Sequence, residues 1–382
     1  MKKLILVLNA GSSSLKFSVF SWQFKKIVSG NLERIGLADP FLGYNKSGQK
    51  KLVKFKKVKN HQEALDKILL ETDFLIDQVA VIGHRVVTGG HKFTKTVFIN
   101  KKVFSLLKKN NNIAPLHNPS NMMGISACIR LLPRAKNVAV FDTSFYKHLP
   151  DYAYTYGLPK TINKKFHLRR YGFHGISHQY VAEQAADKLK KPLKKLNLIS
   201  CHLGNGCSIT AIKSGQAIDT SMGFTPLEGL LMGTRCGDTD PALVIFLLEN
   251  LKVSPQQLNQ LLNKKSGLLG ISGISNDLRE ILIAAGYQVP GFKLKKKYNK
   301  VQKENAKLAL SIYIYRIKKY VSAYYGILGR VDAVIFTAGT GERNANIRKM
   351  VMRGLPFTKK VKILAISTNE ELMIAKQVRK FV

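Results

Sequence analysis

The sequence is poor in acidic residues and in cysteine. It holds 23 Asp+Glu against 62 Lys+Arg, which gives a formal net charge of +39. Its few cysteines form no Cys-x-x-Cys pair, so neither a disulfide framework nor a zinc site is expected. No apolar run approaches the ~20 residues of a membrane-spanning helix. The short apolar stretch 4–8 ends at Asn9, earlier than a secretory signal would, and we expect a cytoplasmic protein.

The lysines are spread along the chain, in runs such as 50–59, 188–195 and 293–303. A basic balance of this size raises nucleic acid or an anionic membrane as a partner. No zinc finger, basic heptad or aromatic RNA-binding signature accompanies the charge, and motif-free charge is typical of solvated surface. We therefore expect neither partner. A positive field would still speed the encounter with an anionic substrate such as ATP.

A length of 382 residues suits two domains. Strand and helix patterns alternate, which indicates an α/β fold. Strands are predicted at 4–8, 15–20, 79–82, 138–141, 196–201, 208–212 and 331–336, and helices at 178–189, 241–251, 304–328 and 344–352. The segments 4–20 and 196–212 share one design, strand, small-residue turn, strand, and predict an internal duplication. The segment 148–168 is the best candidate linker, and 46–60 is an expected exposed hairpin or loop.

Three turns rich in small residues can surround a phosphate. In Asn9-x-Gly-Ser-Ser-Ser-x-Lys16, backbone N–H groups, hydroxyls and one cation come together, although no Walker A loop is present and a plain hairpin is the alternative. The turn 202–206 also has an alternative as a hairpin. The glycine-rich turn 336–344 lies between a strand and a helix, where free N–H donors favour a nucleotide. It lacks the third glycine of a dinucleotide site.

Four further residues stand out by their surroundings. Arg85 and Arg235 lie among glycines, and a guanidinium matches a carboxylate or phosphate bidentately, although most arginines serve only surface solvation. His174 also lies between glycines, where catalysis and structural hydrogen bonding are both open. Asp142 follows a predicted strand, with helix capping as the alternative role. No cluster has zinc spacing, so any metal should be Mg²⁺ accompanying the nucleotide.

Taken together, these segments resemble the acetate kinase family, whose superfamily also contains sugar kinases, actin and the heat-shock chaperone ATPases. The matching stretches run in family order from residue 9 to 375: NAGSSSLKF, HRVVTGG, APLHNP, FDTSF, RRYGFHGISH, HLGNGCSI, GFTPLEGLLMGTRCGDTDP, FTAGTGER and STNEELMIA. The resemblance implies an α/β fold of two actin-like (ribonuclease H-like) domains, with mixed sheets flanked by helices, facing across a nucleotide cleft. The domains would be residues 1–147 with 371–382, and residues 148–370. A homodimer is also implied.

The resemblance implies reversible in-line transfer of the ATP γ-phosphoryl group to acetate, giving acetyl phosphate and ADP. Asn9 and Glu370 would hold Mg²⁺ or Mn²⁺, and Lys16 would contact phosphate. His174 and Arg235 would stabilise the transferred group, and Arg85 would bind the acyl carboxylate. The remaining ATP-site residues would be His202, Leu203, Gly204, Asn205, Gly206, Asp277, Leu278, Arg279, Gly339, Thr340, Gly341, Glu342 and Arg343. The substrate methyl group would contact Val87, Leu116, Phe173 and Pro226.

Asp142 has the label of proton acceptor or donor in such enzymes. Acetate is already ionised at neutral pH and needs no base, so our hypothesis is that Asp142 positions Mg²⁺ or an arginine. Thr340 and Arg343 depart from the family pattern, which leaves the nucleotide preference open. A propionate kinase of the same fold is the nearest alternative, since one methylene discriminates by only ~1–3 kcal/mol. A butyrate kinase fits the compact pattern 116–119 less well. A remoter alternative is an actin-like or chaperone-like ATPase, which would have no reason to keep Arg85, His174 and Arg235.

Overall fold

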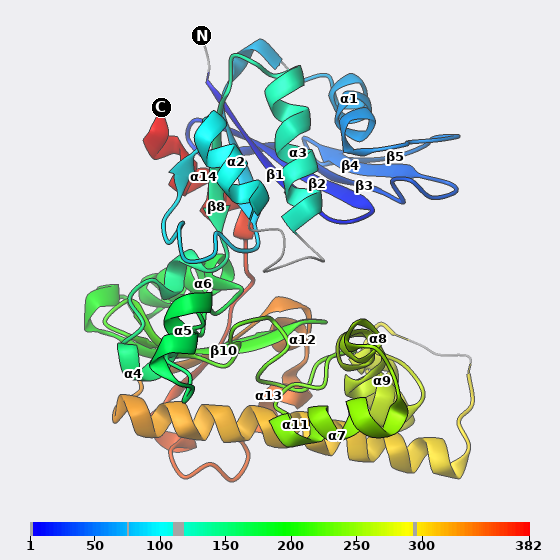
Figure 1. Ribbon diagram of the computed structural model, residues 1–382, viewed down its shortest axis with the longest axis vertical. Helices are drawn as coiled ribbons and strands as arrows, with labels where there is room; N and C mark the ends of the chain where they lie inside the picture. Colours follow the sequence, from blue (N-terminus) through cyan, green and yellow to red (C-terminus); the bar gives the residue numbers. More distant parts are fainter. Residues whose placement is uncertain (1–2, 75, 110–117, 293–295) are drawn as a thin grey trace. The chain divides into compact units, whose positions relative to one another are not determined.

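A computed structural model describes residues 3–74, 76–109, 118–292 and 296–382 (Figure 1). The chain divides into two compact units, which we call unit 1 (residues 1–147 with 369–382) and unit 2 (residues 148–368). None of the helices within the described ranges is long and apolar enough to cross a membrane.

Unit 1 is built on a mixed sheet with strand order β5-β4-β3-β2-β1-β6-β8-β7. Its strands are β1 (Leu4–Ala10), β2 (Ser14–Ser21), β3 (Lys26–Glu33), β4 (Phe41–Lys46), β5 (Gln49–Lys54), β6 (Val79–Val86), β7 (Val97–Phe98) and β8 (Lys136–Phe141). Its helices are α1 (His61–Thr72), α2 (Lys101–Lys109), α3 (Asn118–Leu131) and α14 (Glu370–Val378). β1 runs antiparallel to β2 and parallel to β6, which is itself parallel to β8.

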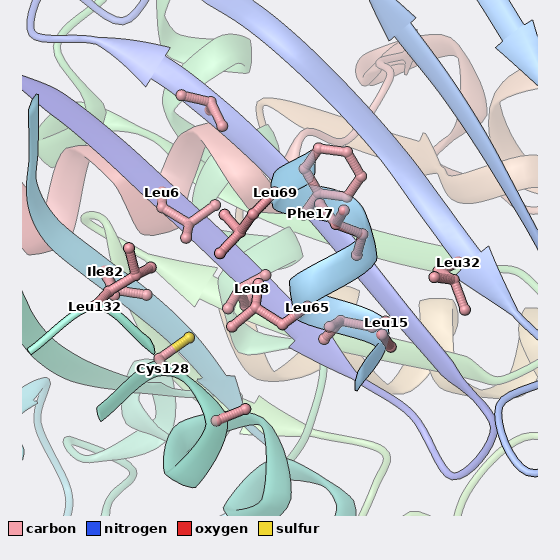
Figure 2. Packing of buried hydrophobic residues seen from close by; sticks show 14 of the residues in the cluster. Leu6, Leu8, Leu15, Phe17, Leu32, Leu65, Leu69, Ile82, Cys128 and Leu132 are labelled. Carbon is pink, nitrogen blue, oxygen red and sulfur yellow. The ribbon is translucent and has the colours of Figure 1, made fainter. Parts of the chain in front are cut away.

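Helices cover both faces of this sheet. On one face Leu6 and Leu8 of β1 pack against Leu65 of α1 and Cys128 of α3 (Figure 2). Ile82 of β6 belongs to the same apolar cluster. The next residue, Gly83, meets α14 so closely that a Cβ there would lie 2.6 Å from Ile374. Because successive strand residues point to opposite faces, α14 covers the other side of the sheet.

Unit 2 contains a second mixed sheet with strand order β11-β10-β9-β12-β13. Its strands are β9 (Asn197–Leu203), β10 (Cys207–Lys213), β11 (Gln216–Thr220), β12 (Ala333–Thr337) and β13 (Lys362–Ala365). Its helices are α4 (Asp151–Tyr154), α5 (Lys160–Phe166), α6 (Gly175–Leu189), α7 (Pro241–Leu251), α8 (Pro255–Gln260), α9 (Gly267–Ser272), α10 (Leu278–Ala284), α11 (Lys300–Leu328), α12 (Ala338–Arg343) and α13 (Ala345–Met352). On β10, Ser208 contacts α6 whereas Cys207 contacts Tyr313 of α11, so these helices lie on opposite faces.

The two sheets repeat one topology. In each, a hairpin of two antiparallel strands continues into two parallel strands, β2-β1-β6-β8 in unit 1 and β10-β9-β12-β13 in unit 2. The predicted α/β class and the predicted duplication are therefore confirmed. The predicted strands and helices are present, and the segment 46–60 begins with the β4–β5 hairpin.

Two local predictions were wrong. The segment 148–168 is no linker, because it contains α4 and α5 and belongs to unit 2. The glycine-rich segment 336–344, predicted as a turn between a strand and a helix, contains the short helix α12 (Ala338–Arg343). Both helices of the first segment have Pro at the N-cap, Pro150 and Pro159, and both are too short to give a readable 3.6-residue period.

Candidate functional site

The serine-rich turn of unit 1 is a tight hairpin between β1 and β2. Asn9 and Lys16 are paired across the two strands, and Gly11 N–H donates to the Ser14 carbonyl at 2.8 Å. Lys16 forms an ion pair with Glu371 of α14. Burial works to raise the pKa of Glu371, but the charge of Lys16 and its hydrogen bond lower the pKa overall. The hairpin geometry is thus present, and its cation is anchored by a carboxylate that the sequence analysis did not select.

Arg85 and Asp142 meet at the carboxyl ends of two neighbouring parallel strands, β6 and β8. The guanidinium donates through Nε to Asp142 Oδ1 at 2.9 Å and through Nη2 to Oδ2 at 2.7 Å. Its Nη1 lies 3.5 Å from Glu370 Oε2 at the first turn of α14. Burial acts to lower the pKa of Arg85, but the charges of Asp142 and Glu370 raise it overall. Asp142 caps no helix, since Thr143 is the N-cap of the short 3₁₀ turn that follows.

One amide links the two predicted anion-binding segments of unit 1. The side chain of Asn121 in α3 donates to the Ala10 carbonyl at 2.8 Å and accepts from Val87 N–H at 3.2 Å. It therefore fixes the end of β1 relative to the segment after β6. Nothing in the local pattern of α3 distinguishes Asn121, because its role depends on two distant segments. Leu116, also predicted to contact substrate, lies outside the described residues.

In unit 2, His174 stands at the N-cap of α6 with a φ of 55°. A left-handed conformation in a non-glycine residue costs about 1–3 kcal/mol and is concentrated at functional sites. The ring stacks on His202 with centroids 4.2 Å apart and planes 16° apart, and its Nδ1 is 2.9 Å from Ser208 Oγ. The i, i+4 spacing of His174 and His178 signals a shared helix face, but the sequence analysis did not use it.

His174 and Arg235 converge on Gly206. A Cβ built on this glycine would lie 3.5 Å from His174 Nε2 and 3.6 Å from Arg235 Nη1. Arg235 donates to the Pro226 carbonyl at 3.3 Å, and it takes part in none of the ion pairs formed by the described residues. Burial lowers the pKa of Arg235, with a smaller opposing effect of Cys207. Its charge is therefore desolvated without a protein carboxylate to balance it, which favours an anionic ligand.

The loop that carries Arg235 is held by close backbone packing. Gly237 has a φ of 71°, and a Cβ there would lie 2.5 Å from the carbonyl oxygens of Gly229 and Leu230. Gly233 N–H donates to the Asn205 carbonyl at 3.1 Å, which ties the loop to the turn 202–206. The predicted substrate residue Pro226 lies in the same loop, and Phe173 is buried directly before His174.

The predicted nucleotide segments line a cavity in unit 2 with a volume of about 510 Å³. A separate cavity of about 650 Å³ lies in unit 1 around Trp22, away from these segments. The walls of the unit 2 cavity come from the turn 204–205, the start of α10, the segment 289–292 and the α12–α13 junction. Predicted residues in the lining are Gly204, Asn205, Asp277, Leu278, Arg279, Gly339, Thr340 and Arg343. The other predicted residues, His202, Leu203, Gly206, Gly341 and Glu342, are described but lie outside the lining.

Phe292 is a wall of this cavity that the sequence analysis missed. The guanidinium of Arg279 lies 4.4 Å from the centroid of the Phe292 ring and donates to Asp277 Oδ2 at 2.6 Å. The hydrogen bond and charge of Arg279 lower the pKa of Asp277. An aromatic ring and a planar cation at one end of a cavity suit a flat heterocycle.

The residues predicted to hold a metal ion have the right donor chemistry for Mg²⁺. Asn9 is the last residue but one of β1, and Glu370 begins α14, which packs on β1 and β6. Glu370, Asp142 and Glu371 contribute three carboxylates beside the two cations Arg85 and Lys16. Burial raises the pKa of Glu370, Arg85 opposes this, and the neighbouring carboxylates add to the rise. A cation would relieve this repulsion, and Mg²⁺ on a nucleotide needs only one or two protein oxygen ligands.

Known proteins resemble this chain over nearly its whole length. The model of the Acetokinase family matches residues 4–359. The acetate kinase of Dictyoglomus turgidum is 44% identical, covering 98% of this chain and 96% of that protein. The solved acetate kinase of Porphyromonas gingivalis is 38% identical with a TM-score of 0.88, covering 99% of each chain. The solved structure of a propionate kinase from Francisella tularensis also has 38% sequence identity and a TM-score of 0.88, and the match covers 100% of each chain. These whole-chain matches confirm the predicted α/β fold with mixed sheets flanked by helices.

Proposed function

The chain belongs to the acetokinase family, and we propose that it is an acetate kinase, which transfers the terminal phosphoryl group of ATP to acetate. The observation that carries this proposal is the convergence of His174 Nε2 and Arg235 Nη1 on Gly206, next to a cavity suited to a nucleotide. A guanidinium and an imidazole held in this way match the charge of a phosphoryl group in transfer.

In the proposed reaction, an acetate oxygen attacks the γ-phosphorus while the bond to the β,γ-bridging oxygen breaks. The products are acetyl phosphate and ADP, and no proton has to be removed from the nucleophile. Catalysis is then positioning and charge neutralisation, with Arg235 and His174 acting on the phosphoryl oxygens. Asp142 occupies Nε and Nη2 of Arg85, so Arg85 would bind the acetate carboxylate through Nη1, the nitrogen that also faces Glu370 at 3.5 Å.

We assign the divalent ion of this reaction as Mg²⁺, with Mn²⁺ as a substitute, held by Asn9 and Glu370. Bound to the nucleotide, it would neutralise phosphate charge. Lys16 would contact a phosphate. We also propose a cytoplasmic location, which the need for ATP and the free cysteines support.

A homodimer is the proposed assembly, and α7 supports it. This helix reads PALVIFLLENL, yet none of its residues is buried, and Ile245 and Phe246 are 58% and 57% exposed. An apolar surface of this kind marks an interface more often than a solvated face. A second copy of the chain is the occupant we propose.

The test is acetate-dependent ATP turnover, with hydroxylamine added to trap the acyl phosphate. We expect ADP release to require acetate and to produce acetohydroxamate in equal amount. ADP release without any carboxylate would favour the ATPase alternative. Specificity constants for acetate, propionate and butyrate decide between acid substrates, and the propionate kinase neighbour makes propionate the second candidate.

A further inference from the structure

A buried hydroxyl joins the catalytic candidate His174 to a second histidine. Ser208 Oγ lies 2.9 Å from His174 Nδ1 and 2.8 Å from His178 Nε2. The other nitrogen of His178, Nδ1, lies 2.8 Å from Ser200 Oγ. Ser200, His178 and Ser208 are all fully buried. The result is a continuous hydrogen-bond chain, Ser200–His178–Ser208–His174, that ends on the ring whose Nε2 reaches Gly206.

Proton counting restricts this chain to two directions. Burial lowers the pKa of His178 well below its usual value, with a further lowering by His202, so this ring is neutral and carries one N–H. It therefore donates one of its two hydrogen bonds and accepts the other. Within the described residues, the two rings are the only hydrogen-bond partners of the Ser208 side chain, so its O–H donates to one ring and its oxygen accepts from the other. The donors along the chain must all point toward His174 or all point away from it.

The direction decides which nitrogen of His174 carries a proton. When the donors point toward His174, its Nδ1 accepts from Ser208, and a neutral ring must carry its proton on Nε2. When they point away, Nδ1 is protonated, and Nε2 carries a proton only if the ring is cationic. Arg235 and His202 are charged and titratable groups that face His174, and His178 faces it through Ser208. The Arg235 charge disfavours a cationic ring. The tautomer of the neutral ring therefore matters at neutral pH.

We propose that Ser208 and His178 are positioning residues that keep a proton on Nε2 of His174, so that this ring donates a hydrogen bond to the transferred phosphoryl group without needing a positive charge. The inference rests on the proposed function, since it takes the group beside Gly206 to be a phosphoryl group. Stacking on His202 sets the plane of the His174 ring, and the hydrogen bond to Ser208 sets its rotation within that plane.

The direct test is ¹⁵N NMR of the full chain labelled only at histidine, which has nine such residues. The His174 signals are assigned by their loss in His174→Gln. We expect Nε2 of His174 to remain protonated from pH 6 to pH 9, with any titration confined to Nδ1. A bare Nε2 at neutral pH in the wild-type protein overturns the proposal.

Variants add a kinetic readout. Ser208→Ala should give mixed tautomers of His174. It should also lower kcat about tenfold and leave KM for ATP and acetate within twofold, because about one hydrogen bond that forms only in the transition state is lost. Ser208→Thr keeps the hydroxyl and should recover most of kcat. Ser200→Ala should lower kcat in the same way but by a smaller factor. It replaces Ser208→Ala as the test if that variant does not fold.

The matched control is Thr72→Val, which removes a buried hydroxyl that donates to the Ile68 carbonyl within α1 of unit 1. Equal kcat in Ser208→Ala and Thr72→Val, with unchanged His174 signals, overturns the proposal and leaves phosphoryl transfer intact. Absence of acetate-dependent turnover in the wild-type protein refutes the proposed function instead, so the two failures are distinct.

Discussion

The carboxylate of Asp142 accepts two hydrogen bonds from the guanidinium of Arg85, at 2.9 and 2.7 Å. With both oxygens engaged by a permanent cation, this carboxylate is poorly suited to remove a proton. Its geometry is that of a clamp, which restricts the arginine to one orientation. The structure thus supports the hypothesis that Asp142 positions an arginine.

Asp142→Asn should raise KM for acetate and lower kcat by about tenfold or more, because the amide replaces one acceptor of the clamp with a donor. A double-mutant cycle with Arg85→Lys measures the coupling, which should be about 0.5–3 kcal/mol for residues in contact. Strict additivity of the two effects would show that Asp142 acts independently of Arg85. A true general base would instead show itself as an acidic limb of the pH–rate profile that disappears in the variant.

Arg235→Ala should lower kcat about 10³-fold or more, as for arginines that neutralise a phosphoryl group in transfer. Steady-state kinetics should show a much smaller change in KM for ATP, and added guanidinium should restore part of the rate. Arg330→Ala is the control, because that arginine is exposed and pairs with Asp332. A loss below tenfold, with guanidinium ineffective, would remove Arg235 from the reaction.

Phe292→Ala should raise KM for ATP by about tenfold while KM for acetate stays constant, since the ring and Arg279 form one wall of the nucleotide cavity. Loss of an aromatic contact of this kind costs about 1–3 kcal/mol where a base stacks on it. Tyr287→Ala is the matched control, because Tyr287 precedes the same segment without lining the cavity. Equal effects of both variants would point to general disturbance of the segment.

The sequence was sufficient for features that depend on local pattern. Alternating apolar residues and the repeated small-residue turns at 9–16 and 202–206 predicted two related sheets, because strand periodicity and tight turns are local properties. The strand ends that carry Arg85 and Asp142 followed from the same reasoning. Family resemblance then selected which polar residues to combine.

Contacts between distant segments could not be predicted in this way. Glu371 beside Lys16, Asn121 between β1 and β6, and Phe292 against Arg279 all bring together elements whose separation in sequence carries no signal. The Ser208–His178 pair was hidden for another reason. Both residues are buried, and a buried histidine next to serines has the same local pattern as an ordinary core position.

Stability should fall as the solution becomes more acidic, because two buried histidines resist protonation. Burial lowers the pKa of His84 to about 4, although its bond to Asn137 opposes this. Below pH 6.5 the unfolded chain therefore binds a proton that the folded chain excludes, and the free energy of unfolding decreases as pH falls toward 4. His84 alone should cost about 2 kcal/mol between pH 7 and pH 5. Denaturant titrations at both pH values measure the loss, which should be smaller in His84→Gln.

Phe246→Gln should convert the proposed dimer to a monomer without lowering monomer stability, since the side chain is already 57% exposed within one chain. Sedimentation velocity gives the mass, and Leu70→Gln on α1 is the control because Leu70 is exposed but lies in unit 1. With a net charge of +39 on each copy, electrostatic repulsion opposes association, so added salt should strengthen the wild-type dimer. An interface made of salt bridges would respond in the opposite sense. A variant that remains dimeric, or a dimer that weakens with salt, would therefore move the interface away from α7.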